Sequence, residues 1–158
     1  MSPDFRGILE ALVKHEVNFL VTGGISAVVQ GAPITTFDVD IVHERTSKNV
    51  EKLISALTEL DARYRTRKDL VIRPEASTLL GTGHHLFMTK FGPLDVLGSI
   101  GNGRIYDELE VETMTIGTMT VRVQSLRSLI EVKEEIGMEK DKAVLPILKR
   151  TLEERQKK

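Results

Sequence analysis

The sequence FLVTGGISAVVQGAPITTFDVDIVHE, residues 19–44, decides how the rest of the chain is interpreted. Its first apolar run ends at Gly23-Gly24 and passes into a short amphipathic segment that closes at Gly31. Glycine pairs at such a point favour a tight strand-to-helix connection, and a glycine after the last apolar residue favours a helix end. The pattern predicts a strand over residues 17–21, a helix over residues 25–30 and a second strand over residues 37–42.

The second predicted strand contains two acids, Asp38 and Asp40. Side chains alternate between the faces of a strand, so the two carboxylates leave on one face and Phe37, Val39 and Ile41 on the other. Two like charges at that separation repel each other unless something compensates them. A divalent metal is the usual compensation, because magnesium prefers hard oxygen ligands. This stretch therefore predicts a metal-dependent site of the phosphoryl type.

Length and composition predict a single domain over residues 1–158. Apolar residues make up 41% of the chain and charged residues 28%, as in ordinary globular proteins. No apolar run approaches the roughly 20 residues of a membrane span, and the N-terminus lacks the apolar core of a secretory signal. Cysteine is absent, which excludes disulfides and favours a cytoplasmic location. The net charge of −1 excludes a global positive field, so any nucleic-acid contact would be local.

The remaining sequence alternates between helical and strand periodicity. Helices are expected over residues 4–16, with a start at Ser2-Pro3, and over residues 48–62. A short strand is expected at residues 69–73, and hairpins are expected from residues 85–89 with 94–97 and from residues 111–116 with 119–123. The final fifth predicts a helix from Ser125 to Gly137 and a last helix that Pro146 either kinks or delays, with a frayed tail from Glu153. The order of elements predicts an α+β fold with a mixed β-sheet, flanking helices and a C-terminal helical pair.

A third acid, Asp95, lies on a separate predicted strand between apolar neighbours. Three strand-borne carboxylates can hold two magnesium ions about 3.5–4 Å apart, which clamps the attacking and leaving oxygens of a displacement. In that scheme Asp38 and Asp40 bind the metals that hold a triphosphate. Asp95 binds the second metal and helps to deprotonate the attacking hydroxyl. The Gly23-Gly24 turn exposes backbone N–H groups beside a helix N-terminus, a combination that attracts phosphate.

The pattern GG-x-x-A…G…T-x-D-x-D resembles the polymerase-beta-like nucleotidyltransferases, especially the small bacterial branch with abortive-infection toxins and aminoglycoside nucleotidyltransferases. Its residues here are Gly23, Gly24, Ala27, Gly31, Thr36, Asp38 and Asp40. The sequence FGPLDVLG around Asp95 is similar to the third-carboxylate strand of that branch. The resemblance covers residues 17–152. It implies a mixed sheet that binds a nucleoside triphosphate, such as ATP, and two Mg²⁺ ions at the Gly-Gly and Asp-x-Asp site.

The C-terminal sequence SLRSLIEVKEEIGMEKDKAVLPIL, residues 125–148, is similar to the closing helices of the same branch. The resemblance implies nucleotide contacts from Lys133, Lys140 and Asp141, and from Ser26 beside the diglycine. Lys133 falls on the apolar stripe of its predicted helix, where a structural lysine is rare. A stem that reaches solvent past the core explains Lys133 equally well. Asp141 has the alternative role of a helix N-cap.

Residues and resemblance together predict a Mg²⁺-dependent nucleotidyltransferase that moves a nucleoside monophosphate from a triphosphate to a hydroxyl acceptor. The acceptor is left open between RNA, protein and small molecule, and a toxin–antitoxin or phage-defence context is one that the branch implies. The chain is short for an acceptor domain, so a partner protein or a homo-oligomer would complete the cleft; no membrane partner is expected.

The alternative is a non-catalytic nucleotide-binding or antitoxin module of the same fold. Ile34 and Thr35, which stand where relatives with Gly-Gly often carry an arginine, allow this alternative, and the three intact acids argue against it. The basic run Arg63–Lys68 is interpreted as a solvated loop, with a grip on an RNA backbone as the second possibility.

Overall fold

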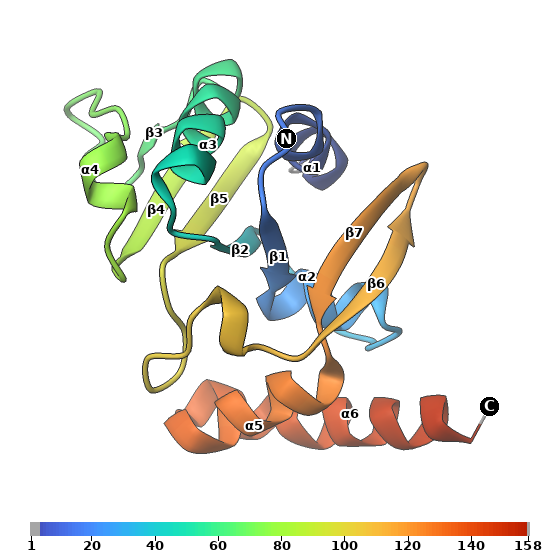
Figure 1. Cartoon of the computed structure of the whole chain (residues 1–158). Coiled ribbons are helices and arrows are strands. Elements are labelled where there is room, and N and C mark those ends of the chain that lie inside the picture. Colours follow the sequence, from blue (N-terminus) through green and yellow to red (C-terminus); the bar gives the residue numbers. More distant parts are fainter. Residues whose placement is uncertain (1–3, 158) are drawn as a thin grey trace.

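A seven-stranded mixed sheet forms the centre of the computed structural model, which describes residues 4–157 (Figure 1). The strand order is β3-β4-β5-β2-β1-β7-β6. The middle of the sheet consists of β5 (Gly92–Leu97), β2 (Val39–His43) and β1 (Phe19–Thr22). Strand β2 runs antiparallel to β1 and parallel to β5. The sheet is completed by β3 (Arg63–Tyr64), β4 (His84–Thr89), β6 (Val111–Ile116) and β7 (Met119–Gln124).

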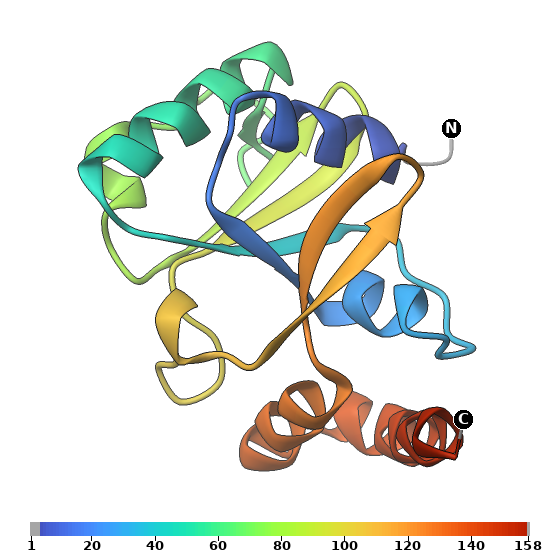
Figure 2. The ribbon, with the colours of Figure 1, turned by 45° about the vertical axis from the view of Figure 1, so that its right-hand side comes forward.

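Helices α1 (Phe5–Lys14) and α3 (Ser47–Glu59) cover one face of the sheet (Figure 2). The side chain of Asp4 accepts a hydrogen bond from Gly7 N and caps α1, while the predicted start at Ser2-Pro3 lies outside the described residues. Apolar side chains at helical spacing then face the sheet and form the main core. This core includes Ile8, Leu9 and Leu12 of α1, Val50, Leu53 and Leu57 of α3, and Val21, Ile41, Leu94 and Val96 of the sheet.

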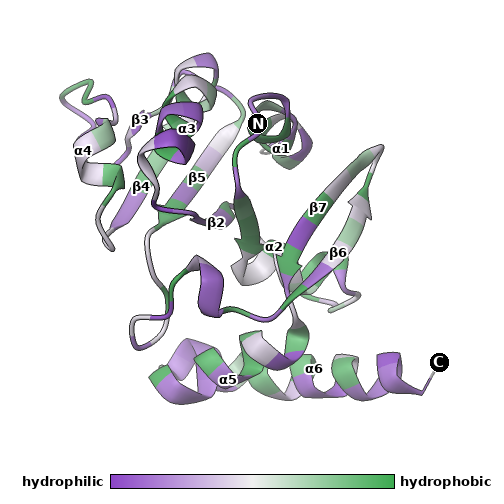
Figure 3. Cartoon of the chain, in the orientation of Figure 1, coloured by the Kyte–Doolittle hydropathy of each residue, from purple (hydrophilic) through white to green (hydrophobic). Residues whose placement is uncertain are grey.

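The other face carries α2 (Gly23–Val29), α5 (Leu126–Ile136) and α6 (Glu139–Gln156). The helices α5 and α6 lie together below the sheet in Figure 1. A second apolar cluster joins Ala27 of α2 to Leu129 of α5 and Leu148 of α6. Figure 3 shows hydrophobic colour on β1 and hydrophilic colour on the last turns of α6, which extend past this cluster. The predicted α+β class, mixed sheet and C-terminal helical pair are confirmed.

Three strand predictions need correction. The first strand begins at Phe19 instead of residue 17, because Val17 N still donates to Leu12 O at the end of α1. The second begins at Val39, which is the first residue of β2 to pair with β5, and Phe37 before it is 70% exposed. The expected strand at residues 69–73 is wrong. Residues 63–64 form β3 instead, and a loop follows them up to α4 (Ala76–Leu79).

The last helix also differs from expectation. The late start suggested by Pro146 is wrong, because α6 begins at Glu139 and continues through the proline. A proline removes one helical N–H, and packing on the second cluster holds the helix despite that loss. The tail from Glu153 is helical as far as Gln156. Arg155 fixes it through an ion pair with Glu112 at 3.2 Å and a hydrogen bond to Gln30 Oε1 at 3.0 Å. No helix within residues 4–157 has both the length and the apolar content that crossing a bilayer requires.

Candidate active site

Three carboxylates meet at the edge of the α5/α6 face of the sheet. Asp38, Asp40 and Asp95 each offer one oxygen, and these oxygens all lie within 4.8 Å of one another. The parallel pairing of β2 with β5 places Asp40 directly opposite Asp95. Asp38 stands one residue before β2 and shares the face of Asp40, as the period of two predicts. The predicted convergence of the three side chains is therefore confirmed, while their chemical roles stay predictions.

The T-x-D-x-D segment packs so closely against the diglycine that neither glycine has room for a side chain. Gly23 has φ +66, a conformation that side chains with a Cβ rarely adopt, and the place of its missing Cβ is taken by the Asp40 carboxylate. A Cβ on Gly24 would lie 2.6 Å from Thr36 Oγ1. Each glycine thus packs against one member of the T-x-D-x-D segment. The motif is a single structural unit, because neither half fits without the other.

A pocket of about 330 Å³ opens beside the carboxylates, between α2, the loop before β2 and the two C-terminal helices. Its lining includes six residues that the sequence proposed for the site: Gly23, Gly24, Asp38, Lys133, Lys140 and Asp141. Pockets of this size hold small ligands in many proteins. The fold therefore gathers residues more than 100 positions apart around one cavity next to the acid cluster.

Lys133 and Asp141 form an ion pair at the wall of this pocket. Lys133 Nζ lies 3.1 Å from Asp141 Oδ1, and only 5% of Asp141 is exposed. Asp141 is not the N-cap of α6, because Met138 occupies that position. Burial of a carboxylate is unfavourable without a partner, so Asp141 fixes the lysine head in the pocket wall. This arrangement favours a site role for Lys133 over a stem that merely reaches solvent.

Ser26 lies in a different environment from the one expected of a nucleotide contact. Its side chain is fully buried, and its hydroxyl donates to Gly23 O at 2.7 Å. It does not line the pocket. The hydroxyl holds the backbone of the diglycine turn in place, so any effect of Ser26 on a ligand would pass through that turn.

Arg65 is a member of the site that sequence reasoning missed. Its Nη1 lies 2.6 Å from Asp95 Oδ1 and its Nη2 3.9 Å from Asp38 Oδ2. The sequence indicates a solvated loop for the run Arg63–Lys68, yet Tyr64 packs on Phe87 with ring centroids 4.6 Å apart. An aromatic residue between two arginines is a period-two signal of a strand, and strand alternation sends Arg65 to the face opposite Tyr64. That pattern was the available clue.

Burial, and then the neighbouring acids, disfavour the ionised forms of Asp38 and Asp40. Burial raises the pKa of the Asp40 carboxyl to about 8, and the hydrogen bond to Asp95 and the charge of Asp38 contribute in the same direction. Burial, followed by the charge of Asp95, also raises the pKa of Asp38, and Arg65 opposes both shifts. Asp95 Oδ1 is buried and has no hydrogen-bond donor aligned on it. Three clustered hard oxygen donors, of which Arg65 offsets the charge of only one, fit a divalent cation such as Mg²⁺.

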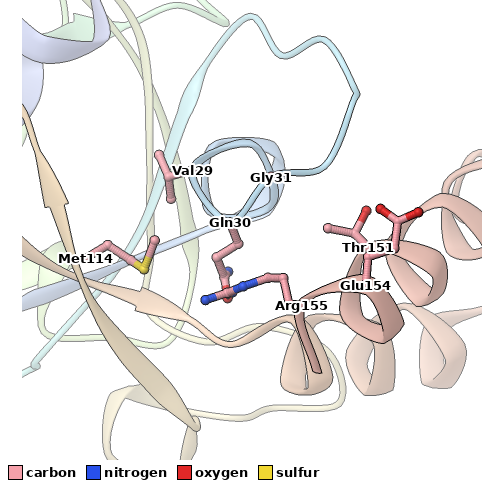
Figure 4. Close-up of a pocket in the computed structure, with 7 residues that line it drawn as sticks. All are labelled: Val29, Gln30, Gly31, Met114, Thr151, Glu154 and Arg155. Atoms are coloured by element: carbon pink, nitrogen blue, oxygen red, sulfur yellow. The ribbon is translucent and has the colours of Figure 1, made fainter. Parts of the chain in front are cut away.

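A second pocket, of about 510 Å³, lies at the far end of α2 (Figure 4). Gln30 and Arg155 point toward each other across it. The polar atoms of Gln30 are already engaged, because Nε2 donates to Ser26 O and Gln124 O while Oε1 accepts from Leu126 N and Arg155. Gln30 therefore links α2 to the C-terminal helices, and none of its polar atoms is free to bind a ligand in this pocket.

Comparison with known proteins gives matches in structure only. No protein-family model matches the chain, and neither does any curated sequence. The lincosamide antibiotic adenylyltransferase LnuA, in its lincomycin-bound crystal structure, superposes with a TM-score of 0.64 at 12% identity, over 94% of this chain and 98% of that one. The chain has the nucleotidyltransferase fold.

Two further structures with the nucleotidyltransferase fold agree. A putative nucleotidyltransferase from Thermotoga maritima gives a TM-score of 0.56 at 19% identity, over 94% of this chain and 90% of that one. ANT(2'')-Ia in complex with adenylyl-2''-tobramycin gives 0.58 at 14% identity, over 93% and 86%. The nucleotidyltransferase fold that the predicted resemblance implies is confirmed.

Proposed function

We propose that this chain is a Mg²⁺-dependent nucleotidyltransferase that transfers a nucleoside monophosphate from a nucleoside triphosphate to a hydroxyl group and releases pyrophosphate. The observation that carries the proposal is the convergence of Asp38, Asp40 and Asp95 beside the pocket that the diglycine and Lys133 line. A fold alone would not carry it, because one fold hosts many functions. The acid cluster supplies the site-level argument.

The residues have distinct roles in this mechanism. Asp38, Asp40 and Asp95 would hold the two Mg²⁺ ions, which when bound polarise phosphoryl oxygens and offset negative charge. Lys133, fixed by Asp141, and Lys140 present positive charge to the triphosphate. Asp95 accepts the proton of the acceptor hydroxyl. The acceptor oxygen bonds to the α-phosphorus as the bond from that phosphorus to the bridging oxygen breaks, so pyrophosphate takes the leaving electron pair. Positioning and electrostatics supply most of the catalysis.

The acceptor is proposed to be a small molecule. LnuA is named as an adenylyltransferase of lincosamide antibiotics, and the match covers 98% of its chain. ANT(2'')-Ia was solved with an adenylylated tobramycin. Both neighbours were solved with a small antibiotic, or its adenylylated form, bound to a chain of this fold. That supports a small-molecule acceptor over RNA or a protein, and it removes the need for a large additional acceptor domain.

A transfer screen tests the proposal. The full chain is incubated with each labelled triphosphate, Mg²⁺ and panels of small alcohols, aminoglycosides, lincosamides, RNA and proteins, and products are identified by mass spectrometry. Transfer should add one nucleoside monophosphate to a hydroxyl, release pyrophosphate and stop when EDTA is added. The variant Asp40→Ala should bind no Mn²⁺ and transfer nothing while its circular dichroism stays native.

The outcomes separate the candidate functions. Turnover retained in Asp40→Ala would rule out this cluster as the catalytic centre. Nucleotide binding without transfer to any acceptor would assign a non-catalytic module of the same fold. The contact of Arg65 with Asp95 is the observation that favours this second candidate, because a guanidinium at that carboxylate opposes its use as a base.

A further inference from the structure

Arg65 is attached to the sheet next to the acid cluster by more than its charge. Its backbone N–H donates to Leu86 O and its Nη1 donates to Phe87 O, both at 3.0 Å. Leu86 is paired with Asp95 in the β4–β5 register, so Arg65, Leu86 and Asp95 stand in one row across the sheet. Cross-strand partners share a face, and the guanidinium therefore reaches the carboxylates from a fixed direction.

The contact between Arg65 and Asp95 is close without being a well-aligned hydrogen bond. The two charged groups approach to 2.6 Å, yet Asp95 Oδ1 is buried and no donor is directed at it. The only aligned acceptor of Nη1 in the described part of the chain is Phe87 O. The guanidinium thus neutralises Asp95 by its proximity, and no aligned hydrogen bond holds it on that oxygen.

The charges of the cluster identify what this arrangement does. When all three carboxyls are ionised, as metal ligands must be, the acids carry a formal charge of −3, and Arg65 reduces the charge of the cluster to −2. One divalent cation would neutralise the cluster with Arg65 in place, whereas a second would meet the guanidinium at Asp95. A cation at Asp95 and the guanidinium of Arg65 are therefore alternatives for the same oxygen.

We propose that Arg65 is a built-in counter-cation that competes with the divalent metal for Asp95, so that Asp95 becomes a metal ligand only when the guanidinium moves off it. The inference rests on the proposed function, in that it takes the acid cluster as a metal site. The hydrogen bond from Nη1 to Phe87 O would keep the displaced guanidinium beside the site. Arg65 is a positioning residue in this scheme, because it acts on the reaction through Asp95.

Metal titration without nucleotide tests the proposal directly. Mn²⁺ binding to the full chain is measured by electron paramagnetic resonance and Mg²⁺ binding by calorimetry, for wild type, Arg65→Gln, Arg65→Lys and Arg67→Gln. Arg67 is the matched control, because it lies two residues away, pairs with exposed Asp69 and carries the same charge. Arg65→Gln should bind Mn²⁺ at least about tenfold more tightly, since a unit charge within a few ångströms of the ion is removed. Arg65→Lys and Arg67→Gln should stay within about threefold of wild type.

The results distinguish this inference from the function it rests on. Equal affinities in wild type and Arg65→Gln would overturn the competition and leave Arg65 as a structural ion pair. Absence of Mn²⁺ binding in wild type, or equal binding in Asp40→Asn, would instead overturn the metal site itself. If Arg65→Gln does not fold, arginine side-chain NMR of wild type decides. Mg²⁺ should shift one Nε resonance that is missing from Arg65→Lys, and a spectrum in which that resonance stays fixed would overturn the proposal.

Discussion

Replacing Asp40 by asparagine should stabilise the metal-free protein at neutral and alkaline pH. The pKa of Asp40 is about 8 in the folded chain, because of burial and the neighbouring acids, against about 3.9 in an unfolded chain. Between these values the folded state holds a proton that the unfolded state releases. This contribution to stability is complete below about pH 3.9, declines as the pH rises and is lost above about pH 8.

The magnitude follows from the shift. At pH 7 the pH lies about 3 units above the pKa of the unfolded carboxyl, while the folded carboxyl still holds its proton. At 1.36 kcal/mol per unit, the free energy of unfolding is lowered by at most about 4 kcal/mol. Half of that, about 2 kcal/mol, would change the melting temperature of a chain of this size by about 4–8 °C. The amide keeps the shape of the side chain and removes the charge. The gain of Asp40→Asn should therefore be largest at pH 8 and close to zero at pH 4.

Scanning calorimetry in EDTA from pH 4 to pH 8.5 measures this effect. Asp69→Asn is the control, because the Asp69 side chain is 72% exposed and its substitution should leave the pH profile unchanged. Mg²⁺ should reverse the order at pH 8, since it stabilises wild type through the carboxylates and cannot do so in the variant. A variant that melts at or below the wild-type temperature at pH 8 without metal would refute the electrostatic reasoning.

Three further predictions concern the surroundings of the cluster. Gly23→Ala should lose about 1–2 kcal/mol from its left-handed backbone and also weaken Mn²⁺ binding, because its methyl group displaces a carboxylate; Gly103→Ala, at φ +98 in open space, should leave Mn²⁺ affinity unchanged. Lys133→Met should lower stability by up to about 3 kcal/mol by leaving buried Asp141 unpaired and should raise the dissociation constant for nucleotide in calorimetry, whereas a purely structural pair would lower only the melting temperature. Burial lowers the pKa of His43, so the stability that its neutral form contributes is complete above about pH 6.5 and is lost as the pH falls through the folded pKa. In the Asp40→Asn background, adding His43→Gln should therefore flatten the fall in melting temperature between about pH 6.5 and 5.

Local sequence signals located most of the helices and strands. Ser125 caps α5 by accepting from Ser128 N, and Gly137 ends it with φ +63, as the sequence pattern indicated. The hairpin of β6 and β7 turns where Gly117 follows residue 116. These features depend on a few neighbouring residues, because a cap, a turn or a period of two acts over less than one helical turn or strand. The errors, such as a strand placed at residues 69–73, arose where strand formation depended on a distant partner.

The candidate site divides in the same way. The sequence by itself determined that Asp38 and Asp40 share a face, since alternation along a strand is local. It also indicated the diglycine turn and, through resemblance, the importance of Asp95. Only the tertiary structure decided that β5 pairs with β2 in the register that sets Asp95 opposite Asp40, and that β3 pairs with β4 so that Arg65 reaches the same carboxylates. Register joins residues that lie dozens of positions apart, and a shift of one residue would turn these side chains to the other face, so no local pattern could have fixed it.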